Sequence, residues 1–240
     1  MSDALKDKTI VVIGGSTGIG FSVAQTAIAK GANVIIGARN AQKLQAAAAK
    51  LGERAKALEV DTSDHESLSA FFNTVGAVDH LFISAATYTI AGIDSNDEQA
   101  IESPFRSKFW GQYWAVKKAF PYLDKAGSIT LMAGAAGARP IKGGAIYAAC
   151  NSAIEGLGRG LAIDLAPIRV NTISPGTIDG HLWQNRPQEI REMAFEHYRG
   201  ASLVGRPGTE QEIADTVLYL MENRFVTGST LYPDGGYALR

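Results

Sequence analysis

The chain has 240 residues, of which 46% are hydrophobic and 20% are charged, and its formal net charge is -1. This length and apolar content suit a single α/β domain over residues 1–240, and the balanced charge argues against nucleic acid or an anionic membrane as a partner. Cys150 is the only cysteine, so no intramolecular disulfide can form, and we expect a cytoplasmic location without signal peptide or membrane span.

Short β-branched runs alternate with longer stretches of helical period along the whole chain. Strands are predicted over residues 9–13, 33–37, 55–59, 80–83, 128–132, 169–173 and 229–231. Helices are predicted over residues 18–30, 41–51, 64–73, 97–123, 145–165 and 210–221. This alternation predicts one doubly wound, parallel, seven-stranded sheet with helices on both faces. Ligands of such sheets bind outside the carboxyl ends of the strands, so the site is expected in the loops that begin there.

A glycine-rich turn follows the first predicted strand and leads directly into a helix. It reads Gly14-Gly15-Ser16-Thr17-Gly18-Ile19-Gly20. Gly14 would allow a tight turn, Gly18 a close approach to a pyrophosphate and Gly20 close packing of the helix on the strand, while the helix N-terminus faces the phosphates. We therefore assign Gly14, Ser16, Thr17, Gly18, Ile19 and Gly20 to cofactor binding. Helix capping is the alternative role for Ser16 and Thr17.

The second and third strands end in residues that suit the adenosine half of a dinucleotide. Arg39 and Asn40 follow the second strand, where an NAD site would usually offer a carboxylate. A guanidinium there can bind a 2′-phosphate, so the sequence predicts NADP (NADPH). The alternative is an NAD-dependent protein in which Arg39 only begins the next helix. Asp61 and Thr62 follow the third strand, and Asp61 suits the adenine amino group or, alternatively, a helix cap.

Several separated motifs resemble the short-chain dehydrogenase/reductase family over nearly the whole chain. They are the glycine-rich turn at 14–20, Asp61, Tyr147, Arg169-Val170-Asn171, Ser174-Pro175-Gly176, Val226-Thr227-Gly228 and Asp234-Gly235-Gly236. The resemblance implies a Rossmann-type fold, oxidoreductase activity with a nicotinamide dinucleotide, and commonly a homotetramer. It implies that Pro175, Gly176 and Ile178 hold the nicotinamide end. Ala85 and Ala86 stand in the cofactor loop where the family has Asn-Asn-Ala-Gly.

The family's catalytic Asn, Ser, Tyr and Lys are altered in three places, and Tyr147 alone is where the resemblance expects it. The lysine position is occupied by Asn151 and the asparagine position by Lys108. In the family the lysine lowers the tyrosine pKa and binds the nicotinamide ribose. We hypothesise a reciprocal exchange in which Lys108 tunes Tyr147 as general acid and Asn151 hydrogen-bonds the ribose. The alternative is a Lys108 side chain that lies in solvent.

The third departure is the family's substrate-orienting serine, which coincides with Gly134. Ser84, Thr87, Tyr88 and Arg139 are candidates for a replacement donor. The sequence thus favours an NADP-dependent oxidoreductase acting on a small carbonyl or alcohol substrate, with a catalytically silent NADP-binding protein as the alternative. No Cys or His cluster points to a metal. The segment 177–208 carries Pro187 and Pro207, interrupts the alternation and is interpreted as a substrate lid.

Overall fold

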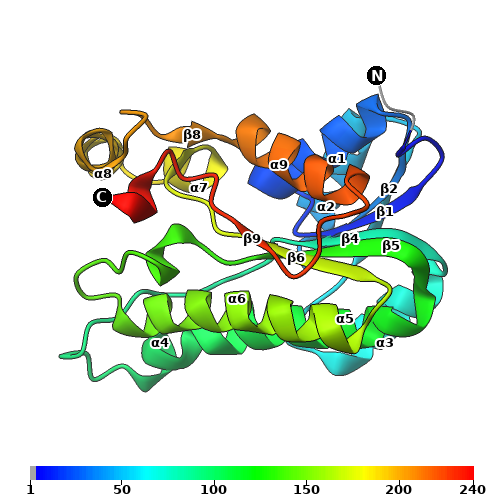
Figure 1. Ribbon diagram of the computed structural model, residues 1–240, viewed down its shortest axis with the longest axis horizontal. Helices are drawn as coiled ribbons and strands as arrows, with labels where there is room; N and C mark the ends of the chain where they lie inside the picture. Colours follow the sequence, from blue (N-terminus) through cyan, green and yellow to red (C-terminus); the bar gives the residue numbers. More distant parts are fainter. Residues whose placement is uncertain (1–3) are drawn as a thin grey trace.

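Seven parallel strands form the central sheet of the computed structural model, in the order β3-β2-β1-β4-β5-β6-β9 (Figure 1). The structure describes residues 4–240, so the first three residues of the predicted domain lie outside it. The strands are β1 (Thr9–Ile13), β2 (Asn33–Ala38), β3 (Ala55–Glu59), β4 (Val78–Ile83), β5 (Leu123–Met132), β6 (Arg169–Ile173) and β9 (Thr230–Leu231). The predicted doubly wound parallel sheet is confirmed, and its strand order reverses between β1 and β4, where such sheets bind ligands.

Helices cover both faces of the sheet because successive strand side chains point to opposite sides. In β1, Ile10 and Val12 pack into the core beneath α1 (Gly18–Ala29), α2 (Ala41–Leu51) and α9 (Glu210–Glu222). Val11 and Ile13 pack into the other core, with α3 (His65–Val75), α5 (Trp110–Ala119) and α6 (Ala145–Asp164). Figure 1 shows these two helix layers above and below the strands. Between residues 4 and 240, no helix has both the length and the apolar content that crossing a membrane requires.

The long helix predicted over residues 97–123 is wrong as a single element. The structure has α4 (Glu98–Ser103), a π-helix η1 (Pro104–Phe109), α5 and a short 3₁₀ turn η2 (Phe120–Tyr122). β5 then begins at Leu123, five residues before the predicted start at 128. Helical periodicity runs through the whole stretch, so it does not reveal where the hydrogen-bond pattern changes from i→i+4 to i→i+5.

The predicted lid segment contains secondary structure that the sequence did not reveal. It forms β7 (Ile178–Asp179), α7 (His181–Gln184), α8 (Gln188–Ala201) and β8 (Gly208–Thr209), and β7 and β8 pair in parallel. Tyr198 of α8 donates a hydrogen bond to the carbonyl of Asp234, and Arg139 donates at 3.0 Å to the carbonyls of Ala201 and Tyr237. The C-terminal residues therefore hold α8 at the end of the sheet where β7 and β8 lie (Figure 1).

Candidate active site

Lys108 lies on the π-helix and points into the protein rather than into solvent. Its side chain is buried, with the residue only 3% exposed. Gln112, one turn later, accepts a hydrogen bond from the Met132 N–H at 2.8 Å and donates to the Met132 carbonyl at 3.0 Å. This reciprocal pair fixes the helix against the end of β5. Because a π-turn inserts one residue, it shifts which side chains face that strand.

The amine of Lys108 has two oxygen acceptors and two aromatic neighbours. Nζ donates to Asn151 Oδ1 at 2.6 Å and to the Ala133 carbonyl at 2.7 Å. It lies 5.4 Å from the ring centroid of Tyr147 and 5.7 Å from that of Tyr88. Two acceptors and two ring faces offset part of the cost of burying a charged amine. The structure therefore brings Lys108, Asn151 and Tyr147 together, from helices far apart in the sequence.

Asn151 is fully buried and both of its polar side-chain atoms are engaged. Oδ1 accepts from Lys108, and Nδ2 donates to the Tyr147 carbonyl at 2.8 Å, one turn earlier on α6. A hydrogen bond from Asn151 to a ribose would require Nδ2 to leave that carbonyl. In the arrangement seen here Asn151 holds the lysine amine in place.

Tyr88 lies directly beside Tyr147. The two rings stack with centroids 5.0 Å apart and an interplanar angle of 24°, and Tyr88 Oη donates to Tyr147 Oη at 3.1 Å. Burial raises the pKa of Tyr88 well above its ordinary value, and the neighbouring Tyr147 raises it further. Tyr88 is therefore a neutral phenol throughout the physiological pH range.

The other three candidates for the missing serine are engaged elsewhere. Ser84 Oγ donates to two backbone carbonyls, at 3.3 Å to Ile13 at the end of β1 and at 3.4 Å to Gly14 of the glycine-rich turn. Thr87 Oγ1 accepts from Arg39, and Arg139 bonds the C-terminal segment. A side chain at Gly134 would begin 3.5 Å from Tyr147 Oη and 3.2 Å from Asn151 Oδ1. The serine position of the resemblance thus lies against the Tyr147 hydroxyl, and this glycine leaves the position unfilled.

The glycine-rich turn has the shape that a pyrophosphate-binding loop needs. Gly14 and Gly18 have φ of 96° and 61°, in the left-handed region that favours glycine. A Cβ at Gly20 would lie 2.2 Å from the Gly14 carbonyl oxygen, so only glycine allows this approach of helix to turn. Thr17 is the N-cap of α1, yet its side chain makes no capping hydrogen bond. The first turn of α1 therefore keeps N–H groups for an anion, and the turn fits a dinucleotide.

We expect Gly20→Ala to lower the free energy of unfolding by about 1–3 kcal/mol, because backbone must move to admit the methyl group. Gly160→Ala on α6 is the matched control, since nothing lies within 4 Å of its added Cβ. That variant should be neutral or more stable by up to about 1 kcal/mol, as alanine favours helix. Chemical denaturation of both variants measures the difference. Equal stabilities would contradict the close approach at Gly20.

The residues predicted for the adenosine half lie next to one another. Arg39 is exposed after β2, and its Nη2 donates to Thr87 Oγ1 at 2.7 Å. Asp61 Oδ1 accepts from the N–H and hydroxyl of Ser63 at 2.9 and 2.7 Å. Partial burial acts to raise the pKa of Asp61, but the Ser63 hydrogen bonds and the charge of Arg39 lower it overall. Asn40 caps α2 by accepting from the Lys43 N–H at 2.8 Å, and Thr62 packs against Gly111 of α5.

The loop predicted to contact the cofactor through Ala85 and Ala86 follows β4, and the loop predicted to hold the nicotinamide end follows β6. Ala85 donates its N–H to the Ile13 carbonyl at 3.1 Å, next to the glycine-rich turn, and Ala86 follows it on the surface. The Pro175 carbonyl accepts from Ala135 at 2.9 Å, and Gly176 lies so close to Tyr198 that a Cβ would collide with its hydroxyl. Ile178 is buried in β7. These loops surround the same end of the sheet as Tyr147.

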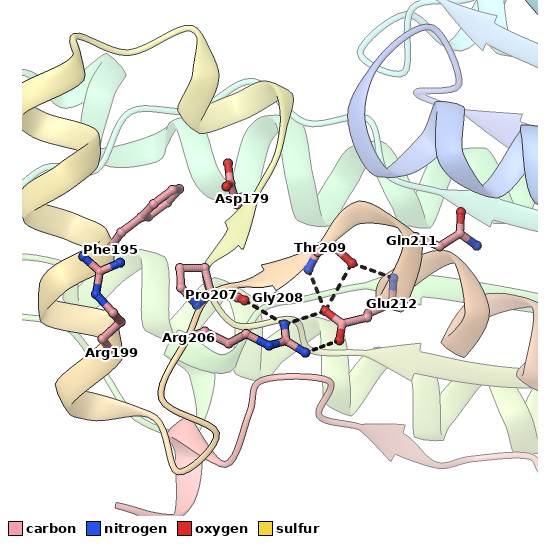
Figure 2. A pocket seen from close by; sticks show the side chains of 9 residues that line it. All are labelled: Asp179, Phe195, Arg199, Arg206, Pro207, Gly208, Thr209, Gln211 and Glu212. Carbon is pink, nitrogen blue, oxygen red and sulfur yellow. Dashed lines mark hydrogen bonds and ion pairs between the residues drawn. The ribbon is translucent and has the colours of Figure 1, made fainter.

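The segment interpreted from the sequence as a lid lies next to the glycine-rich turn at the start of α7. The position of a Gly18 Cβ is 3.6 Å from His181 Cβ and 3.4 Å from Oε1 of Glu210, whose carboxylate accepts from the His181 N–H at 2.6 Å. On its other side, the segment borders an open cavity of about 460 Å³. Figure 2 shows this cavity, with Phe195 and Arg199 projecting from α8 and the ion pair between Arg206 and Glu212. It is lined by Asp179, Phe195, Arg199, Arg206, Pro207, Gly208, Thr209, Gln211 and Glu212 and includes none of the residues around Tyr147.

Sequence reasoning did not single out two features of this site. Tyr88 was one of four equal candidates, because its distance to Tyr147 depends on the path of the loop after β4. Gln112 was missed altogether. The signal available in the sequence was the i, i+4 spacing of Lys108 and Gln112, which places both side chains on one helix face. The structure shows that both are buried.

Comparisons with known proteins give the family to which the chain is similar. Residues 14–238 match the family described as enoyl-(acyl carrier protein) reductase. The chain is 30% identical to a short-chain dehydrogenase/reductase of Gibberella fujikuroi, over 98% of this chain and 96% of that protein. It is 29% identical to the 3-oxoacyl-[acyl-carrier-protein] reductase of Mus musculus, over 97% and 99%.

Two solved structures are similar over nearly their full lengths. The MalC reductase/Diels-Alderase of Malbranchea aurantiaca superposes with a TM-score of 0.92 at 27% identity, covering 99% of each chain. A small-chain dehydrogenase in complex with NADPH has a TM-score of 0.83 at 30% identity, covering 98% of this chain and 100% of that one.

Proposed function

The chain belongs to the short-chain dehydrogenase/reductase family, and from this we propose that it transfers hydride between NADP(H) and a small carbonyl or alcohol. The observation that carries the proposal is the contact of Lys108 with Asn151 beside the ring of Tyr147. Lys108 brings an amine to Tyr147, although the position four residues after Tyr147, where the family has lysine, is occupied by Asn151. When bound, the nicotinamide supplies or accepts the hydride.

Tyr147 is the proposed proton donor in the reducing direction and acceptor in the oxidising direction. A positive charge beside a phenol stabilises the phenolate that remains after proton donation. Lys108 Nζ, 5.4 Å from the centre of the Tyr147 ring, is the source of that charge. Asn151 and the Ala133 carbonyl position the amine, because each accepts one of its hydrogen bonds. The role of Asn151 that we propose is therefore to orient Lys108 rather than to bind the ribose.

The glycine-rich turn, Asp61, Thr62 and the loops containing Ala85, Ala86, Pro175, Gly176 and Ile178 would hold the dinucleotide. Arg39 would bind the 2′-phosphate and so set the preference for NADP over NAD. In support, Arg39 is exposed and no carboxylate accepts a hydrogen bond from it among residues 4–240. The NADPH complex of a structural relative with 30% identity also favours this assignment.

We expect Arg39→Ala to weaken NADPH binding by about 10- to 100-fold, because hydrogen bonds to a charged group each contribute about 1.5–3 kcal/mol. NADH affinity should change little. Isothermal titration of NADPH and of NADH into the wild type and Arg39→Ala measures the affinity for each cofactor. Arg224→Ala is the control, because Arg224 is an exposed arginine after α9. A wild-type protein that binds NADH at least as tightly as NADPH would overturn the proposed cofactor preference.

The segment 177–208 is the proposed substrate lid, since its helix α7 begins beside the glycine-rich turn. The homotetramer that the resemblance implies stays a prediction. Trp110 of α5 and Ile146 of α6 are 47% and 37% exposed and give these two helices an apolar surface that would suit it.

A further inference from the structure

The hydroxyl of Tyr147 has a second phenol as its immediate partner. Tyr88 Oη lies 3.1 Å from Tyr147 Oη, and the two rings stack. Two oxygens at this separation can both lie within about 2.7 Å of a third oxygen atom. The pair can therefore receive one acceptor oxygen, with Tyr147 donating its own hydrogen and Tyr88 turning its hydroxyl hydrogen from Tyr147 to that oxygen.

The charges around the pair favour an acceptor that gains negative charge. Lys108 Nζ lies 5.7 Å from the centre of the Tyr88 ring and 5.4 Å from that of Tyr147. Burial keeps the pKa of Tyr88 high, so this phenol retains its proton and stays a donor. A fixed neutral donor beside a proton-transferring group stabilises charge that develops on an oxygen in the transition state.

Gly134, which has no side chain, lies next to the hydroxyl of Tyr147. A Cβ at Gly134 would lie 3.5 Å from Tyr147 Oη and 3.2 Å from Asn151 Oδ1, so the amide would have to shift by a few tenths of an ångström to admit it. The φ of Gly134, 179°, is extended backbone that any residue adopts. Among the four hydroxyl or guanidinium groups considered for this role, Tyr88 alone has a hydrogen bond to Tyr147 in the part of the chain described. A second hydroxyl beside Tyr147 therefore comes from the loop after β4.

We propose that Tyr88 is a catalytic residue, the second hydrogen-bond donor to the substrate oxygen, occupying the role that a side chain at position 134 would otherwise fill. This inference rests on the proposed function. In the reducing direction the carbonyl carbon gains the hydride from NADPH, which becomes NADP⁺, and the carbonyl oxygen takes the Tyr147 proton. Tyr147 is left as phenolate and regains a proton from solvent. Tyr88 keeps its own proton throughout and donates a hydrogen bond to the oxygen as its negative charge grows.

The test compares Tyr88→Phe with Tyr113→Phe, which removes a phenol hydroxyl from a ring that contacts only Trp110 and Trp114 among the aromatic residues described. Turnover of a panel of aliphatic, aromatic and cyclic aldehydes and ketones is measured with NADPH. Tyr88→Phe is expected to lower kcat and kcat/KM together by about 10²–10³-fold, as loss of one donor to a developing oxyanion does. NADPH affinity should not change, and Tyr113→Phe should match the wild type.

The double variant Tyr88→Phe/Gly134→Ser supplies a hydroxyl from position 134, whose Cβ would lie 3.5 Å from Tyr147 Oη. We expect it to recover at least about tenfold of the lost kcat, equivalent to about 1.4 kcal/mol. A double variant no better than Tyr88→Phe, or a Tyr88→Phe protein that behaves like Tyr113→Phe, would overturn the proposal. Thermal unfolding of each variant shows whether the fold is kept.

A binding measurement separates failure of this inference from failure of the proposed function. Isobutyramide has a carbonyl oxygen but does not accept hydride, and its affinity is measured by titration in the presence of NADPH. If the wild type turns over no carbonyl, the proposed function is wrong, and isobutyramide binding decides the role of Tyr88. Binding about tenfold weaker in Tyr88→Phe supports a donor to the carbonyl oxygen. Equal binding, or no binding by the wild type, overturns it.

Discussion

Replacing Lys108 with methionine is expected to lower kcat by about 10²–10⁴-fold, the range that proton transfer by a positioned and tuned group contributes. Methionine keeps most of the volume of the buried side chain but removes the amine beside Tyr147. The Ala133 carbonyl and Asn151 Oδ1 each lose a donor, and each loss costs about 1–3 kcal/mol of stability. Steady-state kinetics with NADPH and thermal unfolding measure the two effects.

A second variant separates the chemical role of the amine from its packing role. Lys108→Asn/Asn151→Lys returns the lysine to the helix that carries Tyr147, four residues beyond it, where side chains share a face. We expect this double variant to recover at least tenfold of the turnover lost in Lys108→Asn. A merely structural lysine would give no such recovery.

Lys117→Met is the matched control for this series, because Lys117 lies exposed on α5. It should leave kcat unchanged. A Lys108→Met protein that folds and turns over substrate as fast as the Lys117→Met protein would show that the buried amine has no part in the reaction.

Tyr147→Phe is expected to reduce kcat by about 10²–10⁴-fold while NADPH affinity stays near that of the wild type. The variant removes one oxygen and keeps the ring that stacks on Tyr88 and lies beside Lys108. Because cofactor binding and turnover are measured separately, this variant distinguishes an enzyme from a catalytically silent NADP-binding protein. Turnover of the carbonyl panel and isothermal titration with NADPH are the two measurements.

Two outcomes would contradict that expectation in different ways. Unchanged turnover in Tyr147→Phe would show that another group donates the proton, and Tyr88 is the neighbouring phenol. A wild type that binds NADPH and reduces no carbonyl would favour the silent protein, since the Tyr147 hydroxyl would then have no chemical task.

The fold class and the conformation of the glycine-rich turn followed from the sequence by itself. Apolar runs of strand length alternating with amphipathic stretches require a parallel sheet covered on both faces, because each strand carries apolar side chains on both sides. The glycines of the turn at 14–20 reflect local backbone conformation, which sequence neighbours determine. Such features depend on residues close together in the chain.

Only the tertiary structure decided how the altered catalytic residues meet. Lys108 and Asn151 are 43 positions apart, and Tyr88 and Tyr147 are 59 apart. The direction of Lys108 depends on the π-turn at η1, whose extra residue changes which side chain faces β5, and periodicity does not register that change. The position of Tyr88 depends on the path of an irregular loop. Contacts between distant elements are decided by helix register and packing, so only the folded chain distinguished the hypothesised exchange from a Lys108 in solvent and revealed the tyrosine pair.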